Sequence, residues 1–118
     1  MKLITVSLLT LTLLTANIDM PKEDLGTQEV KKVKNFYKKY LQKSCGYTAA
    51  NFAQMHTQKE WKNLQKNKKF IDEVLKTCPS ATTMVAKILI KDKGKEAFNY
   101  LVRFSIQYAK GSGKFPPC

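Results

Sequence analysis

The clearest pattern in the chain is an apolar stripe that begins just after Thr27 and has lysines on its opposite side. Its members recur every three or four residues: Val30, Val33, Phe36, Tyr37, Tyr40 and Leu41. This spacing is typical of one face of an α-helix packed on a core. Gly46 follows Cys45 and accepts the left-handed conformation that closes a helix, so the pattern predicts a helix ending near Cys45.

Two signals predict the helices in the middle of the chain. A short helix is expected over 48–55, and the segment Thr57-Gln58-Lys59-Glu60 fits a capping box at the start of the next one. His56 precedes this cap and Trp61 is the fourth helical position, so the two rings are expected to pack as a hydrophobic staple. The inward residues of the short helix are Phe52 and Ala53.

Three more helices are expected toward the end of the chain. Asn67 is interpreted as the N-cap of a helix that ends before Pro79, and Ser80 as the cap of the next. The last helix follows residues 92–94 and ends at Gly111. The predicted inward residues are Phe70, Ile71, Val74, Leu75, Cys78, Met84, Val85, Ile88, Leu89, Ala97, Phe98, Leu101, Val102, Ser105 and Tyr108.

Together these patterns predict an all-α fold, an irregular bundle of five or six short helices in a single domain over 27–118. Residues 111–118 form its polar, proline-bearing C-terminal tail. The run Ile88-Leu89-Ile90 is the one stretch that could alternatively form a strand, but a single strand would have nothing to pair with.

The first 16 residues have a different character from the rest. Lys2 precedes an apolar and hydroxyl-bearing run from Leu3 to Thr15, which ends at the small residue Ala16 and has the anatomy of a signal peptide. A spanning helix needs about 20 apolar residues, which makes an uncleaved anchor the weaker alternative. Residues 17–26 are expected to form an extended leader. We therefore expect a cleaved signal peptide over 1–16 and a periplasmic or secreted mature chain without a transmembrane segment.

Three cysteines, Cys45, Cys78 and Cys118, remain after such cleavage. In an oxidising compartment one pair is expected to be bridged, which leaves one thiol over. The spacing does not select among the three pairings. A bridged Cys118 would pin the C-terminal tail.

The formal charge of +12 comes from twenty lysines and a single arginine, Arg103. Bidentate recognition of phosphates and bases favours guanidinium groups, so nucleic acid is not the expected partner. The bias indicates either a solvated cationic surface or attraction to an anionic membrane, acidic protein or polymer. The candidate residues for an anionic surface are Lys31, Lys34, Lys38, Lys59, Lys62 and Lys66.

The usual signatures of catalysis and metal binding are missing from the sequence. His56 is the single histidine, and the cysteines form no Cys-x-x-Cys pair, whereas a zinc site needs three or four ligands. The chain has no Gly-x-Ser-x-Gly elbow and no glycine-rich phosphate loop. We expect no catalytic residue, no metal and no cofactor. Thiol–disulfide chemistry is the enzymatic activity that we would test first.

One familiar pattern spans residues 45–61. It begins with Cys45-Gly46-Tyr47-Thr48-Ala49 and continues through His56-Thr57-Gln58-Lys59-Glu60-Trp61. It resembles the haem-attachment region of small exported c-type cytochromes, in which Cys-x-x-Cys-His is followed by a similar helix start. Thr48 stands at the second cysteine and Ala49 at the axial histidine, so the resemblance implies a helical scaffold without covalent haem. If haem were bound, its candidate ligands would be His56, Met55 and Cys45.

Three functional hypotheses follow from these observations. The first is an exported, non-catalytic binding or accessory protein with a cytochrome-c-like scaffold that lacks haem. The second is a cationic protein that binds an anionic membrane surface or polymer. The third is a small-ligand carrier whose cavity lies between aromatic residues that otherwise form core: Phe36, Tyr37, Tyr40, Phe98, Phe104 and Tyr108.

Overall fold

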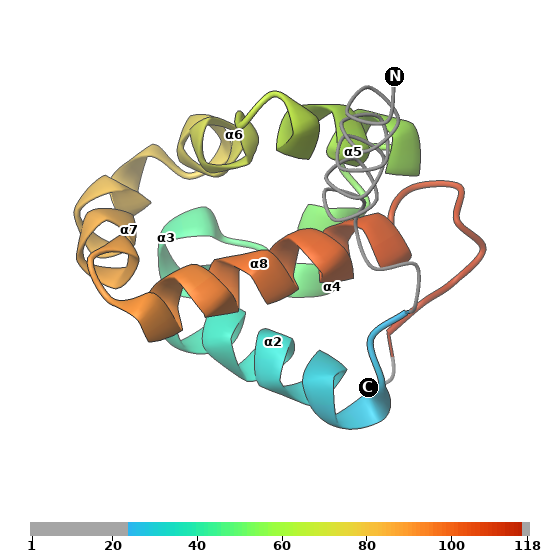
Figure 1. Cartoon of the computed structure of the whole chain (residues 1–118), viewed down its shortest axis with the longest axis horizontal. Coiled ribbons are helices and arrows are strands. Elements are labelled where there is room, and N and C mark those ends of the chain that lie inside the picture. Colours follow the sequence, from blue (N-terminus) through green and yellow to red (C-terminus); the bar gives the residue numbers. More distant parts are fainter. Residues whose placement is uncertain (1–23, 117–118) are drawn as a thin grey trace, which may run out of the picture.

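The computed structural model describes residues 24–116, which form a bundle of α-helices (Figure 1). The elements are α2 (Thr27–Tyr40), α3 (Gln42–Cys45), α4 (Ala49–Ala53), α5 (Gln58–Lys66), α6 (Phe70–Thr77), the 3-10 turn η1 (Pro79–Ala81), α7 (Thr82–Leu89) and α8 (Asp92–Gln107). Between residues 24 and 116 there is no strand, only an isolated β-bridge between Thr57 and Lys110. The all-α prediction is confirmed. The expected signal peptide, most of the leader and Cys118 lie outside the described residues.

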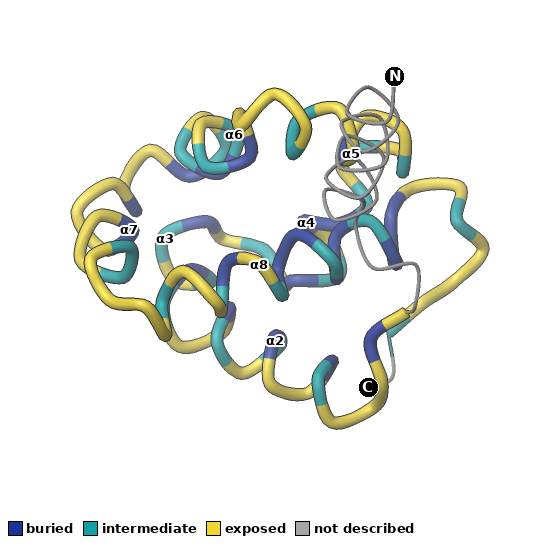
Figure 2. The backbone as a smooth tube through the Cα atoms, viewed as in Figure 1, coloured by how far each residue is buried: buried dark blue, intermediate teal, exposed yellow. Residues whose placement is uncertain are grey.

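Helix α8 is the central element of the bundle. It packs against α2, α4, α5 and α7. Figure 2 shows buried positions along α8 and α4 in the middle of the molecule and exposed positions along the outer helices. The predicted inner stripe of α8 is confirmed at Phe98, Leu101, Val102 and Ser105, all of which are buried.

A cluster of aromatic side chains around Phe52 forms one part of the core. The Phe52 ring centroid lies 5.1 Å from that of Trp61 and 5.7 Å from that of Tyr37. The indole N–H of Trp61 donates to the backbone oxygen of Ala53 at 2.8 Å, so its one polar atom is satisfied inside the core. These contacts confirm the prediction that Phe52 and Ala53 face inward.

The predicted start of α5 is present in full. The Thr57 hydroxyl accepts from the Glu60 N–H at 3.2 Å, and the Glu60 carboxylate accepts from the Thr57 N–H at 2.8 Å. The His56 and Trp61 rings meet edge to face with centroids 4.8 Å apart. The capping box and the staple are both confirmed.

The prediction that Asn67 caps the start of α6 is wrong. Asn67 is instead the C-cap of α5, and Lys68 follows it with a positive φ of 57°. The Lys69 N–H donates to Leu64 O at 2.7 Å and the Lys68 N–H to Gln65 O at 3.1 Å, the two bonds of a Schellman motif. Glycine usually occupies the position held here by Lys68, and its absence hid the helix end from the sequence pattern.

The boundaries around α7 also differ from the prediction. Ser80 lies inside η1 and donates to the Ser44 backbone oxygen at 3.2 Å, so it does not cap α7. Met84 was expected to face inward but is 38 % exposed, whereas Val85 is buried. Ile88 and Leu89 belong to the last turn of α7, which excludes the alternative strand over these residues.

The other long helices keep their predicted faces but shift at their ends. The helix predicted from Thr27 to Cys45 is interrupted at Leu41, whose φ of −121° departs from helical geometry, and it continues as α3 to Gly46 in the left-handed region. Helix α8 already begins at Asp92 and ends at Gln107, ahead of the predicted Gly111. After α8 the chain reaches the start of α5, where the Lys110 N–H donates to His56 O at 3.0 Å.

A disulfide joins Cys45 at the end of α3 to Cys78 beside η1. Both half-cystines are buried. The bridge selects one of the three pairings that the sequence left open, and it fastens α3 to the connection between α6 and α7.

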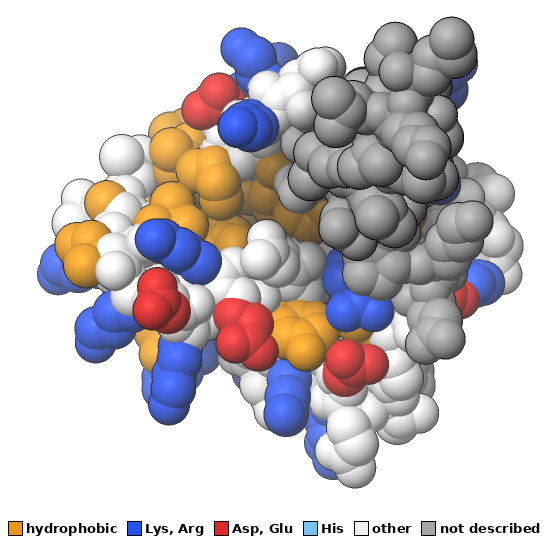
Figure 3. Space-filling model, in the orientation of Figure 1, with side chains coloured by type: hydrophobic (Ala, Val, Ile, Leu, Met, Phe, Trp, Pro, Cys, Tyr) orange, Lys and Arg blue, Asp and Glu red, His pale blue; other side chains and the backbone are white. Residues whose placement is uncertain are grey.

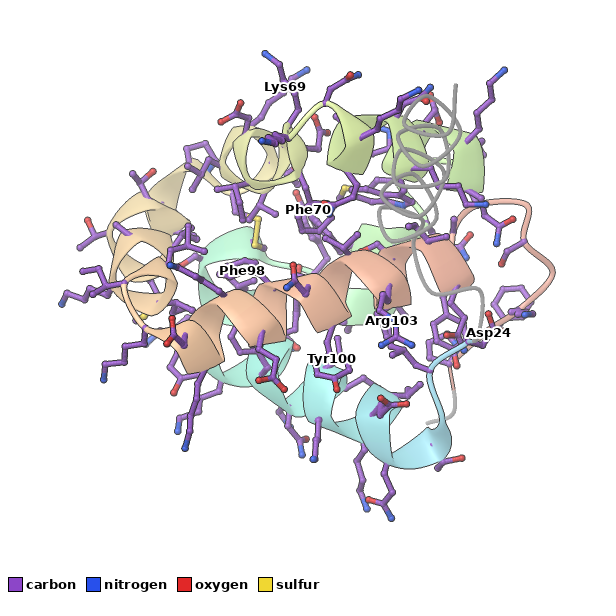
Figure 4. All side chains as sticks on the ribbon, viewed as in Figure 1. Asp24, Lys69, Phe70, Phe98, Tyr100 and Arg103 are labelled. Atoms are coloured by element: carbon purple, nitrogen blue, oxygen red, sulfur yellow. A yellow bond between two sulfur atoms is a disulfide. The ribbon has the colours of Figure 1, made fainter. Side chains whose placement is uncertain are left out.

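The beginning and end of the described chain are joined by side chains. The buried Gln107 amide accepts from the Leu25 N–H at 2.6 Å and donates to Leu25 O at 3.3 Å. Lys114 forms an ion pair with Asp24, which is labelled beside the C-terminal segment in Figure 4. The segment after α8 is thereby held against the start of α2.

Candidate functional site

The lysines proposed from the sequence do not lie on one face of the molecule. Lys31, Lys34 and Lys38 belong to α2, whereas Lys59, Lys62 and Lys66 belong to α5. Figure 1 shows α2 and α5 on opposite sides of α8, and Figure 3 shows lysine and arginine side chains spread over the visible face in several separate places. The charge is therefore distributed, and a specific site needs a second feature besides cations.

That second feature occurs where α7 turns into α8. Ile90, the C-cap of α7, is 80 % exposed, although it is a large apolar side chain. Lys87, Lys91 and Lys93 surround it in sequence and are exposed as well. We call these four residues the α7–α8 corner. Ile90 is thus a large apolar side chain exposed close in sequence to three exposed lysines, with the exposed Asp92 between two of them.

A groove of about 330 Å³ opens beside this corner, between α2, α7 and the first turns of α8. The apolar part of its lining comes from Phe36, Tyr40, Met84, Ile88 and Ala97, and the cationic part comes from the three lysines of the corner. No carboxylate belongs to this lining. The groove therefore combines an apolar wall with three lysines, and Asp92, between Lys91 and Lys93 in sequence, is exposed but lies outside the lining.

The wall of the groove is fixed by ring packing. Phe36 lies between two other rings, with its centroid 5.5 Å from that of Tyr40 and 5.4 Å from that of Phe98, which it meets edge to face. Phe98 belongs to the first half of α8, as Figure 4 shows, and is buried. The contact between Phe36 and Phe98 thus connects the α2 side of the groove to α8.

The other side of the groove depends on a close approach between α7 and α8 at Gly94. A Cβ atom at this position would fall 1.8 Å from the backbone oxygen of Ile88. Only glycine permits this approach, and both Ile88 and Gly94 belong to the lining of the groove.

Some of the aromatic residues pack in the core and others line the groove, the two roles proposed for them from the sequence. Tyr37, Phe98, Phe104 and Tyr108 are buried core residues. Phe36 and Tyr40 are partly exposed and line the groove. The sequence did not identify the groove, because its lining residues come from three helices and Met84 had been assigned to the core.

His56 serves a different part of the molecule. Its Nε2 lies 2.7 Å from a Glu73 carboxylate oxygen and its Nδ1 lies 3.8 Å from Glu60 Oε1. The backbone hydrogen bond from Thr57 lowers the pKa of Glu60. His56 thus connects the start of α5 to α6. Within residues 24–116 there is no group of three or more His, Cys, Asp or Glu side chains suited to hold a metal ion.

The residues at the cytochrome-like positions do not fit covalent haem. The Cys45 sulfur is bonded to Cys78 and has no thiol left for a thioether bond. Thr48, at the second cysteine position, accepts from the Asn51 N–H at 3.2 Å as the N-cap of α4. Ala49 is buried at the axial position and offers no donor atom. Met55 and His56 lie in the turn after α4.

Comparison with known proteins yields no match to a family model, to a curated protein or to a solved structure. Within residues 24–116 no helix combines the length and the apolar composition needed to cross a bilayer.

Proposed function

We propose that this chain is an exported, non-catalytic protein that binds anionic membrane surfaces through the α7–α8 corner. The observation that carries the proposal is Ile90, 80 % exposed and flanked by Lys87, Lys91 and Lys93. Export rests on the signal-peptide pattern of residues 1–16, and the non-catalytic role rests on the residue types available in the sequence. The resemblance to c-type cytochromes contributes only a helical scaffold to this proposal.

Two interactions at a lipid interface form the physical basis of this proposal, apolar insertion and electrostatic attraction. An apolar side chain at an exposed corner enters the boundary between headgroups and acyl chains, and nearby lysines meet the anionic headgroups. Each lysine close to such a surface contributes about 1 kcal/mol of attraction. Lysine suits this role because its long stem can lie along apolar material while its ammonium group stays hydrated. A fluid interface also needs no matching protein pocket for Ile90.

The test compares two triple variants of equal charge change. The variant Lys87→Gln, Lys91→Gln, Lys93→Gln should weaken binding to vesicles of equal parts phosphatidylglycerol and phosphatidylcholine by at least about tenfold. The matched variant Lys59→Gln, Lys62→Gln, Lys66→Gln alters α5 on the other side of α8 and should weaken it less. Binding is measured by vesicle sedimentation at several salt concentrations and should decline as salt rises.

A second pair of variants separates insertion from charge. Ile90→Ser should reduce vesicle binding, whereas Phe115→Ser removes a similarly exposed apolar side chain, 78 % exposed, from the C-terminal segment and should leave binding unchanged. Equal losses from the two lysine triples, or undiminished binding of Ile90→Ser, would contradict a corner-specific membrane site. Equal binding to pure phosphatidylcholine would contradict the requirement for an anionic surface.

A further inference from the structure

We propose that the groove between α2, α7 and α8 binds one molecule of a long-chain carboxylate, with its acyl chain along the apolar wall and its carboxylate at the lysine rim. This inference rests on the proposed function in one respect, because the rim lysines are those of the α7–α8 corner. It adds a ligand that enters the protein, whereas membrane binding needs only the outer surface.

The lining of the groove is suited to a hydrocarbon chain. Two rings, Phe36 and Tyr40, form one side, and Ile88 and Met84 form the other. Met84 is 38 % exposed although it carries a long apolar side chain, so a ligand would cover apolar surface that now faces water. The flexible thioether chain of methionine also adapts to ligands of different shape.

The polar residues of the groove specify the sign of the charge that the ligand carries. Lys87 lies on α7, Lys91 on the connection and Lys93 on the first turn of α8, so the lysines of the lining come from both sides of the turn between the two helices. With three cations and no carboxylate in the lining, the groove favours an anionic headgroup and disfavours an amine. One acidic group at the end of an apolar chain matches this distribution.

The size of the groove limits the ligand to a single chain. Its volume of about 330 Å³ is at the low end of small-molecule sites, which range from about 300 to 1,000 Å³. A phospholipid with two chains needs more room. The side opposite the rings is held in place by the contact at Gly94, where a Cβ would reach 1.8 Å from Ile88 O, so the groove cannot widen there without moving a helix.

The test uses dodecanoate below its micelle concentration, titrated into the full chain by calorimetry in the absence of vesicles. Ala97→Phe fills the groove from α8 and should weaken dodecanoate binding by at least about tenfold. The matched control Ala86→Phe adds the same ring at an exposed position of α7 outside the lining and should leave the affinity unchanged. Dodecylamine should bind more weakly than dodecanoate.

A measurement on the unsubstituted protein keeps the test independent of how Ala97→Phe folds. Amide chemical shifts should move on addition of dodecanoate at residues 84–97 and around Phe36, and should stay constant in α5. Shifts centred elsewhere, equal affinity of Ala97→Phe and Ala86→Phe, or equal binding of dodecylamine would overturn the groove proposal.

The two proposals fail in different experiments. Ala97→Phe keeps the α7–α8 corner, so it should bind anionic vesicles as well as the unsubstituted chain does. If Ile90→Ser loses vesicle binding but retains its affinity for dodecanoate, the result would support both the membrane site at the corner and the ligand site in the groove. If the protein binds dodecanoate but does not bind anionic vesicles, the membrane proposal would be refuted and the groove proposal would not be contradicted.

Discussion

Tyr37 is a fully buried side chain whose hydroxyl has no hydrogen-bond partner within the described residues. Burial raises the pKa of this phenol well above its ordinary value, and the neighbouring Tyr47 adds a smaller effect in the same direction. The ring itself packs on Phe52, with centroids 5.7 Å apart. The ring therefore contributes to the core, while the hydroxyl costs stability.

We expect Tyr37→Phe to raise the free energy of unfolding near pH 7 by about 1 kcal/mol, because an unsatisfied buried hydroxyl is removed and the ring stays. The difference in the free energy of unfolding between the variant and the original protein should grow above pH 10. There the unfolded tyrosine ionises while the folded one stays neutral, so the original protein loses about 1.4 kcal/mol per pH unit that the variant retains. Urea unfolding from pH 7 to 11 measures both effects.

Tyr100→Phe is the matched control for this prediction, because Tyr100 is only partly buried and lies next to Arg103. It should change neither the stability near pH 7 nor the alkaline slope appreciably. A loss of stability in Tyr37→Phe would show that the hydroxyl has a partner that the packing does not reveal.

Residue-level prediction succeeded where neighbours in sequence are neighbours in space. Thr57 and Glu60 cap each other across three residues, and His56 meets Trp61 across five. It failed for Gln107, whose amide binds the backbone of Leu25, 82 residues away. Nothing near a glutamine in sequence signals such a partner, so its burial could not be predicted.

Helix faces were predictable but helix ends were less so. Apolar spacing places Val30, Val33 and Tyr37 on the buried side of α2 as expected. The end of α5 was missed because Lys68 holds the left-handed position that glycine normally marks. Met84 has helical spacing yet lies at the surface, since spacing does not tell how far the core extends around a helix.

Gly94 offers a test at the level of helix packing. In an ordinary helix interior, replacing glycine with alanine stabilises the fold by about 1 kcal/mol. Here the added Cβ would fall 1.8 Å from the Ile88 backbone oxygen, so α7 and α8 would have to separate. We expect Gly94→Ala to lower the free energy of unfolding by about 2–3 kcal/mol, measured by thermal and urea denaturation.

The control for Gly94→Ala is Asn99→Ala, an exposed position of the same helix, which should be neutral or slightly stabilising. A stabilised Gly94→Ala protein would mean that α7 and α8 are not in close contact at this point. The groove between them would then lack its fixed wall.

At the scale of the whole molecule, the candidate site depends on contacts that no local pattern contains. The charge excess indicated anionic partners, but the six lysines selected from the sequence lie on two helices separated by α8. The groove instead joins Phe36 of α2 to Ala97 of α8, residues 61 positions apart. The apolar run Ile88-Leu89-Ile90 next to Lys91 was the one local signal for the corner, but it had been interpreted as the inward end of a helix, with a strand as the alternative.

The bridge between Cys45 and Cys78 connects the two halves of the described chain over a sequence separation of 33 residues. Closing a loop of this length restricts the unfolded chain by about 3–4 kcal/mol. We expect the double variant Cys45→Ala, Cys78→Ala to lose about that amount in urea unfolding, and reduction of the original protein to have a similar effect. A domain of this size has a free energy of unfolding of about 5–15 kcal/mol in total, so the loss should be large but leave helical structure measurable by circular dichroism.

Cys118→Ala keeps both bridged cysteines and should retain the full stability. A protein equally stable after reduction would show that packing of the helices around α8, rather than the bridge, holds α3 against η1.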